Sequence, residues 1–206
     1  MLDPDYAVAV CGFGRCGSTM AMQMLAAGGL RPGNADEPPY EGDRVAMAGE
    51  DFTGTCVKLL DKPITAAVLA GPTRAWRFIW LDRNRYEQAL SYLKFLKHLA
   101  PLTGITGDNF TPEQVANTFR RDRPGHIAQL HAAGRVLVLN YDSVLADPAA
   151  AADRVRQKIL PGLDVTAAAA QVHQRDGLCR PDLAVELAFN HHPLGACPPA
   201  TTRSAT

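Results

Sequence analysis

A run of glycine and hydroxyl residues near the amino terminus has the composition of an anion-binding loop. Residues 12–19 read G-F-G-R-C-G-S-T, between a short apolar run and a segment in which methionine and leucine recur at helical spacing. Glycines let a backbone turn tightly, so that successive N–H groups form a nest for phosphate oxygens. A helix that begins near Ser18 would add free N–H groups and the positive end of its dipole. The pattern predicts a phosphate-binding loop.

The same loop lacks the lysine of a nucleoside triphosphatase. In the Walker A pattern G-x-x-x-x-G-K-[ST], a lysine reaches the β- and γ-phosphates, but Ser18 stands at that position here. The cation of this loop comes earlier, at Arg15. The missing lysine counts against triphosphate hydrolysis. The simpler alternative is a glycine turn that Ser18 caps, with Arg15 in solvent.

A second candidate site follows a later apolar run. Residues 76–91 read W-R-F-I-W-L-D-R-N-R-Y-E-Q-A-L-S, so Arg83 comes just after an expected strand and Ser91 lies in the helix that follows. A guanidinium at that place can bind a phosphate with two parallel hydrogen bonds. The alternative is an ion pair of Arg83 with Asp82 or Glu87 on the surface.

Apolar runs and helical patterns alternate along the chain. Strands are expected at residues 6–11, 56–60, 76–81 and 135–140, and helices at 20–28, from 63, at 86–99, from 111, at 148–160 and at 165–174. This alternation predicts a three-layer α/β/α fold with a mostly parallel sheet and a P-loop-like strand, loop and helix. Ligands of such folds bind at the carboxyl ends of the strands, where both motifs fall.

Proline and glycine mark the less regular parts. Residues 31–51 hold three prolines and three glycines and are expected to form an irregular segment on the acceptor side. Pro124 and Gly125 should break or kink the helix that begins after Thr111. The tail at 197–206 is expected to be disordered, which leaves one domain over residues 1–196.

The composition is that of an ordinary globular protein. The 206 residues include 21 Lys and Arg against 21 Asp and Glu, so the formal net charge is zero. Bulk positive charge therefore cannot hold nucleic acid or a membrane, and neither is expected as a partner. Five cysteines without a CxxC spacing favour a reduced chain and give no zinc signature. With no basic leader and no apolar run of about 20 residues, a cytoplasmic protein is expected.

Together the motifs resemble those of the sulfotransferases that use 3′-phosphoadenosine 5′-phosphosulfate (PAPS). Residues 14–19 are similar to the family's 5′-phosphosulfate loop, usually [KR]-S-G-[ST]-[ST]. Residues 78–91 are similar to its 3′-phosphate motif, in which a serine follows the arginine by eight residues, as Ser91 follows Arg83. Residues 136–148 are similar to a later strand followed by Y-E-x-[LM] and a D-P helix start. The chain departs from the pattern at Cys16, where serine is usual.

The resemblance implies a role for each matching residue. Arg15 would contact the 5′-phosphosulfate and stabilise charge on the leaving oxygen. Arg83 and Ser91 would hold the 3′-phosphate that distinguishes PAPS and its product 3′,5′-ADP from ordinary nucleotides, and Tyr141 would lie near the nucleotide. The other cofactor-binding residues would be those of the loop, namely Gly14, Cys16, Gly17, Ser18 and Thr19. No metal is expected.

A hydroxyl acceptor also needs a base to take its proton. The first candidate is Glu37, because its place after the first helix resembles that of the catalytic glutamate in bacterial trehalose sulfotransferases. The alternative is that Glu37 is one of several solvated acids. Weaker candidates for the base are Glu50, Asp51, His98, His126, His131, His191 and His192.

Two basic features have no assigned role. Lys58 lies inside an apolar run, which is unusual for lysine, and either points to the sulfonate site or reaches solvent at the strand end. Arg120, Arg121 and Arg123 are expected to form a solvated helix face; the alternative is that they bind an anionic acceptor or cover the nucleotide.

The sequence as a whole predicts a sulfotransferase that moves a sulfuryl group from PAPS to a hydroxyl or amine of a small-molecule acceptor. The alternatives are a P-loop kinase of a small metabolite and a catalytically inactive nucleotide-binding module. A homodimer is a reasonable assembly for a chain of this size. The acceptor itself cannot be predicted, because the loops that would contact it carry no recognisable code.

Overall fold

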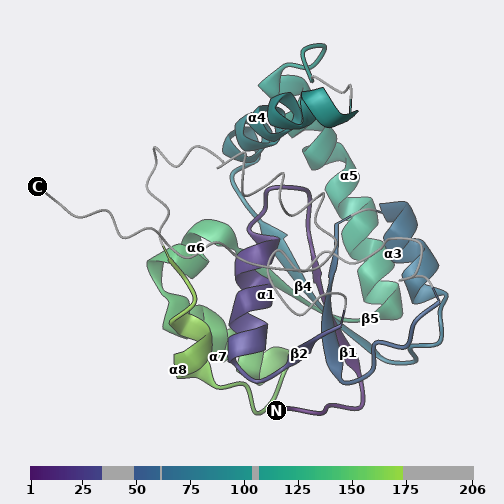
Figure 1. Cartoon of the computed structure of the whole chain (residues 1–206), viewed down its shortest axis with the longest axis vertical. Coiled ribbons are helices and arrows are strands. Elements are labelled where there is room, and N and C mark those ends of the chain that lie inside the picture. The colour runs from purple at the N-terminus through teal and green to yellow at the C-terminus, as the bar shows by residue number, and fades with distance from the viewer. Residues whose placement is uncertain (34–48, 61, 104–106, 174–206) are drawn as a thin grey trace, which may run out of the picture. The chain divides into compact units, whose positions relative to one another are not determined.

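Five parallel strands form the central sheet of the computed structural model (Figure 1). Their order across the sheet is β2-β3-β1-β4-β5. The strands are β1 (Ala7–Cys11), β2 (Arg31–Pro32), β3 (Thr55–Leu59), β4 (Trp76–Asp82) and β5 (Gly134–Asn140). The structure describes residues 1–33, 49–60, 62–103 and 107–173. The predicted tail and the end of the predicted domain lie outside these residues.

The inner strands are apolar because helices cover both faces of the sheet. Every residue of β1 and of β3 is buried. On one face, Val8 and Val10 pack with α1 (Ser18–Ala27), α7 (Pro148–Lys158) and α8 (Val165–Ala169). On the other face, Ala7 and Ala9 share a core with α3 (Lys62–Leu69) and α5 (Pro112–Ala133). Figure 1 shows the two helical layers on opposite sides of the sheet, and the predicted three-layer α/β/α class is confirmed.

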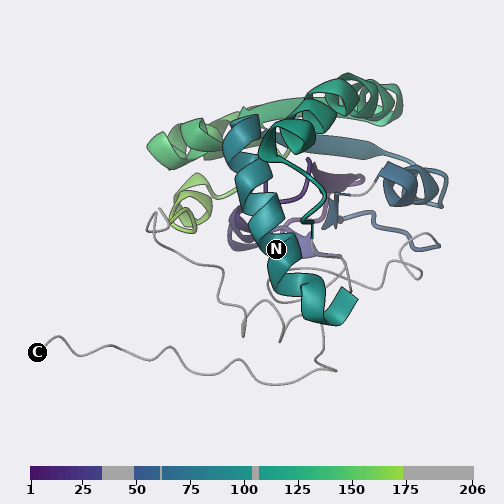
Figure 2. The same ribbon diagram turned by 90° about the horizontal axis from the view of Figure 1, so that it is seen from above.

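Helix α4 (Arg85–Thr103) lies apart from these two layers. It packs on the first half of α5 through a small apolar cluster of its own, made by Ala89, Leu93, Val115 and Phe119. Figure 2 shows α4 crossing beside α5 at a steep angle. This packing places the first turns of α4 against the loop that follows β1.

Two predicted helix starts are confirmed at their caps. Thr111 and Gln114 form a capping box at the start of α5, and the Asp147 side chain accepts a hydrogen bond at the start of α7. Of the two expected effects of Pro124 and Gly125, a break does not occur, because α5 continues to Ala133. Pro124 removes one backbone hydrogen bond, but Leu130 beyond it is buried against the sheet and holds that half of α5 in place.

Three smaller elements differ from the sequence-based expectation. Strand β2, only two residues long, pairs with β3 at the start of the segment expected to be irregular. Helix α6 (Tyr141–Ala146) follows β5 directly, where none was expected. Helix α8 ends at Ala169, earlier than predicted, with Asp164 as its cap. Each is short, so its sequence carries little periodic signal.

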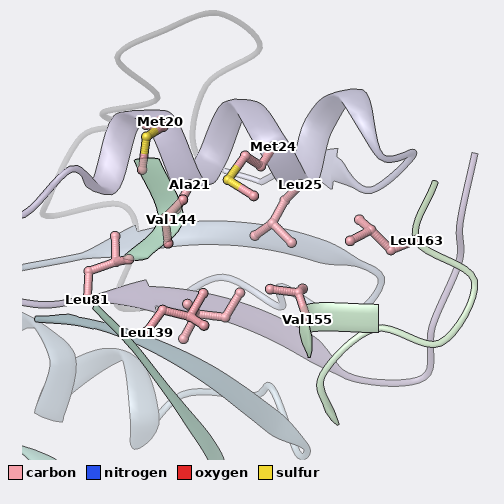
Figure 3. Close-up of a pocket in the computed structure, with 10 residues that line it drawn as sticks. Met20, Ala21, Met24, Leu25, Leu81, Leu139, Val144, Val155 and Leu163 are labelled. Atoms are coloured by element: carbon pink, nitrogen blue, oxygen red, sulfur yellow. The ribbon is translucent and has the colours of Figure 1, made fainter. Parts of the chain in front are cut away.

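The core beneath α1 is not perfectly filled. A cavity of about 10 Å³ lies between this helix and the sheet, and its lining is apolar, with Met24, Ile79 and Leu163 among the contributors (Figure 3). A space of this size holds at most one water molecule, and the lining offers no polar partner for one. The cavity is therefore a packing gap, and a ligand site must be sought elsewhere. Among the described helices, none has both the length and the apolar character needed to cross a bilayer.

Candidate functional site

The strand order creates a point at which connections diverge. From β1 the chain continues through α1 to the edge strand β2, whereas from β4 it continues through α4 and α5 to the opposite edge strand β5. Because β1 and β4 are neighbours, the loops that follow them lie side by side at the carboxyl edge of the sheet. In open parallel sheets this is where ligands bind. Both sequence motifs begin at this point, one after Cys11 and one after Asp82.

The loop after β1 adopts the conformation of an anion nest. Arg15 has a φ of 68° and Gly17 a φ of 96°, both in the left-handed region. Gly17 is also the N-cap of α1 and provides no side-chain cap for the helix. Within the part of the chain that the structure describes, the amides of Gly14 and Gly17 donate to no acceptor. Unpaired N–H groups at a helix N-terminus are suited to an anion.

The structure brings the two motifs into contact. The Nε atom of Arg15 lies 3.5 Å from the Ser91 hydroxyl, across 76 residues of sequence. Arg83 donates from Nη1 to the carbonyl oxygen of Arg15 at 3.2 Å. The Arg15 guanidinium also lies over the ring of Phe95, 5.1 Å from its centroid. Two arginines and a serine thus surround the loop from the side of α4.

Tyr141 closes the other side of this group. Its ring lies under the Arg83 guanidinium, 4.8 Å from the centroid, and against Gly17 so closely that a Cβ there would come within 2.6 Å of it. The Nε atom of Arg83 is buried and has no hydrogen-bond partner among the described residues. A buried, unpaired guanidinium donor is costly unless a ligand accepts from it. This atom therefore fits an anionic ligand beside the loop.

Two side chains in the middle of the loop, those of Cys16 and Ser18, are buried. Cys16 is fully buried in the core beneath α1, and burial raises its pKa to about 11 despite hydrogen bonds from Ser18. Ser18 is also buried, and its side chain contacts Cys16. Cys16 can therefore serve an anion only through its backbone.

Lys58 lies near the same loop and does not reach solvent, which was one of the two alternatives for it. It stands on β3 opposite Val10 and is 9% exposed. Its Nζ atom lies 3.4 Å from the hydroxyl of Thr19, in the first turn of α1. A cation from the neighbouring strand therefore stands near the loop, where the Walker lysine of the loop itself is replaced by Ser18.

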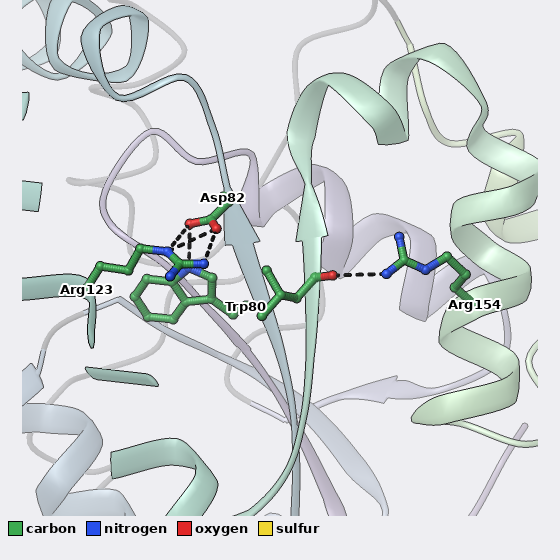
Figure 4. A network of polar contacts seen from close by, with 5 residues as sticks. Trp80, Asp82, Arg123 and Arg154 are labelled. Carbon is green, nitrogen blue, oxygen red and sulfur yellow. Dashed lines mark hydrogen bonds and ion pairs between the residues drawn. The ribbon is translucent and has the colours of Figure 1, made fainter. Parts of the chain in front are cut away.

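Asp82 does not pair with Arg83, contrary to the surface alternative. Its carboxylate accepts hydrogen bonds from Arg123 of α5 and from the indole of Trp80, as Figure 4 shows together with the bond from Arg154 to β5. Burial acts to raise the pKa of Asp82, but the bonds from Arg123 and Trp80 outweigh it and the pKa is lowered. Arg123 is therefore not part of the solvated helix face that was expected, because it is partly buried against Asp82. Arg120 and Arg121 are exposed, as expected.

Gln88 is a residue of the site that sequence reasoning missed. Its side-chain amide donates to the carbonyl oxygens of Phe13 and Gly14, at 2.9 and 3.0 Å. The ring of Phe13 packs on Phe119 of α5, with centroids 4.7 Å apart. No signal in the sequence marks Gln88, because a glutamine on a helix is ordinary and its partners lie 75 and 74 residues away.

None of the acidic candidates for the catalytic base is placed beside the loop within the described residues. Glu37, His191 and His192 lie outside the described residues. Glu50 and Asp51 are exposed and precede β3, so they lie at the amino edge of the sheet. Since β3 spans five residues, about 16 Å separates that edge from the loop. Asp51 also accepts hydrogen bonds from Thr53 and Thr73.

Of the histidines, only one has a described side chain near the loop. His126 of α5 packs against the ring of Phe13, with centroids 5.2 Å apart. His131 lies exposed near the end of the same helix, and the side chain of His98 lies outside the described set. The described residues contain no group of three or more His, Cys, Asp or Glu placed to hold a metal ion.

Comparison with known proteins adds no assignment. No protein-family model matches the chain, and no curated protein matches it. The function proposed below is therefore supported by the geometry of the site and by its sequence motifs.

Proposed function

We propose that this protein is a sulfotransferase that moves a sulfuryl group from PAPS to a hydroxyl or amine of a small-molecule acceptor. The observation that carries the proposal is the contact between Arg15 of the first motif and Ser91 of the second, 3.5 Å apart. Two motifs that resemble the 5′- and 3′-phosphate sites of one nucleotide thus meet at one edge of the sheet. Neither motif alone would be specific.

The residues at this edge are suited to a nucleotide with phosphates at both ends. Arg83 and Ser91 would hold the 3′-phosphate, for which the buried Nε of Arg83 is an available donor. The backbone of Gly14, Cys16 and Gly17 would hold the 5′ end, together with Ser18 and Thr19 at the start of α1. Tyr141 would flank the nucleotide beside Arg83. PAPS would supply an activated sulfuryl group at this place.

The protein's own contribution to transfer would be positioning and charge. Negative charge grows on the leaving phosphate oxygen, and the side chains of Arg15 and Lys58 would stabilise it. The S–O bond to that oxygen breaks as the acceptor oxygen or nitrogen bonds to sulfur. The acceptor's proton would pass to Glu37, the proposed base.

The decisive experiment is a calorimetric titration with 3′,5′-ADP and, separately, with ADP. The proposal expects binding of 3′,5′-ADP that is clearly tighter than binding of ADP. Equal affinity would favour the kinase alternative, and no binding of either nucleotide would overturn the nucleotide site. An inactive binding module is recognised when PAPS binds but no acceptor in a panel of alcohols and amines is sulfated.

The first prediction concerns the 3′-phosphate. Replacing Arg83 with alanine should weaken 3′,5′-ADP by about 10-fold to 100-fold, because a charge-assisted hydrogen bond contributes about 1.5–3 kcal/mol. ADP lacks that phosphate and should lose less than about threefold. Arg85→Ala is the control, since this exposed arginine lies two residues further on. Equal losses for the two nucleotides would contradict the role given to Arg83.

A further inference from the structure

Three consecutive carbonyl groups of the loop are held from the same side. Gln88 of α4 donates to the carbonyl oxygens of Phe13 and Gly14 at 2.9 and 3.0 Å. Arg83, just before α4, donates to the next carbonyl oxygen, that of Arg15, at 3.2 Å. Side chains of the second motif therefore hold the side of the loop that faces α4.

This arrangement dictates where the amides of the loop point. In a trans peptide unit the C=O and the following N–H point in opposite directions. When Gln88 holds the carbonyls of residues 13 and 14, the N–H groups of Gly14 and Arg15 must face away from α4. Successive N–H groups that face the same side make the concavity that binds an anion. Gln88 thus sets the direction of anion-binding groups that it does not itself touch.

The position of Gln88 is rigid enough for this role. Its side chain is 3% exposed, so solvent does not compete for its two N–H donors. The helix that carries it is fixed by Ala89 and Leu93, which pack against α5. A buried donor with two partners of good geometry has little freedom to turn.

We propose that Gln88 is the positioning residue that presets the loop for its anion, so that affinity for the 5′ end of the nucleotide depends on a side chain outside the ligand's reach. The identity of the anion rests on the proposed function, whereas the presetting of the loop does not. Without the two hydrogen bonds from Gln88, the loop amides would have to become ordered when the anion binds. The entropy lost in that ordering would weaken the affinity.

The test compares Gln88→Met, which keeps length and removes both donors, with Gln157→Met on α7 as the matched control. Gln157 is exposed, so its exchange should change nothing at the loop. Gln88→Met should weaken 3′,5′-ADP by about tenfold, in the range expected for residues that act through a second group. In the free protein, the amide NMR resonances of Gly14 and Arg15 should shift in this variant and not in the control.

A second variant separates positioning from packing. Gln88→Glu is nearly isosteric, but an ionised carboxylate cannot donate to the two carbonyls, while its protonated form donates once. Burial raises the pKa of such a carboxyl group. The ratio of variant to wild-type affinity should therefore recover as the pH falls from about 8 to about 5. A purely structural role would leave that ratio independent of pH.

The outcomes distinguish the two proposals. Wild-type affinity and unshifted loop resonances in a folded Gln88→Met variant would overturn the role of Gln88 and leave the proposed function standing. If the wild-type protein does not bind 3′,5′-ADP, the proposed function fails, and the resonances of Gly14 and Arg15 alone decide whether Gln88 presets the loop. If Gln88→Met does not fold, the pH-dependent ratio of Gln88→Glu decides.

Discussion

Gly17 is the residue at which the loop, helix α1 and Tyr141 meet. Its backbone is left-handed, with a φ of 96°, which is strained for any residue with a Cβ. The Tyr141 ring occupies the space that a Cβ would need. Two independent features therefore require glycine at position 17. One is the left-handed turn, and the other is the Tyr141 ring, which also lies under Arg83.

A Gly17→Ala exchange should therefore lower the free energy of unfolding by about 1–2 kcal/mol, since strain of the left-handed backbone adds to the clash. Urea unfolding measures the change. Gly125→Ala is the control with the opposite expected sign, because Gly125 lies in α5 with only the end of Lys62 within 4 Å. Alanine in a helix is more stable than glycine by about 0.5–1 kcal/mol. A neutral Gly17→Ala variant would contradict the geometry of the loop.

At the scale of elements, the pair of Asp82 and Arg123 joins the end of β4 to α5. Its contribution to stability depends on pH in a defined direction. The pKa of Asp82 is lowered in the folded protein, so the stabilisation is present above the unfolded value of 3.8 and is lost as the pH falls through the folded value. The pair is partly exposed, which reduces its contribution.

We expect Asp82→Asn to lower the free energy of unfolding at neutral pH by about 1–2 kcal/mol, because charge-assisted bonds from Arg123 are lost. The difference from wild type should shrink as the pH falls below about 4. Urea titrations across this pH range measure it. Asp153→Asn, which removes a surface pair with Arg156 on α7, should cost less than about 0.5 kcal/mol. A difference that does not change with pH would exclude ionised Asp82 as its source.

The elements also show how far the sequence could lead. Strand β4 was predictable because every residue from Trp76 to Leu81 except Arg77 is apolar. The sequence also placed both motifs at the carboxyl ends of strands, but it did not predict the contact of Arg15 with Ser91, which requires β1 and β4 to be neighbours. The two-residue β2 was not predictable either, because only its pairing with β3 defines it. Gln88 could not be found either, since it reaches the loop only through hydrogen bonds to two carbonyl groups that are distant in sequence. What the sequence left out are two short elements, β2 and α6, and the interactions between elements.

At the scale of the whole molecule, zero net charge coexists with a basic edge. Arg15, Lys58 and Arg83 come from three different places in the chain, and the parallel sheet brings them to one edge because its strands all end there. Asp82, the acid nearest to Arg83 in sequence, is turned toward Arg123. The fold therefore supplies locally the positive charge that the composition does not supply in bulk.

This arrangement predicts where ligand binding should protect the backbone. With 3′,5′-ADP at about 100 times its Kd, amides that exchange only after ligand release should exchange about 100-fold more slowly. We expect that protection in residues 12–20 and in the first turns of α4. Hydrogen exchange read by mass spectrometry measures it. Residues 50–54, at the amino edge, and α7, which contributes Val155 to the lining of the apolar cavity, serve as internal controls and should not change. Protection confined to α7 would place the ligand in the core cavity, and protection at 50–54 would place it at the wrong end of the strands; either result would contradict a site at the carboxyl edge.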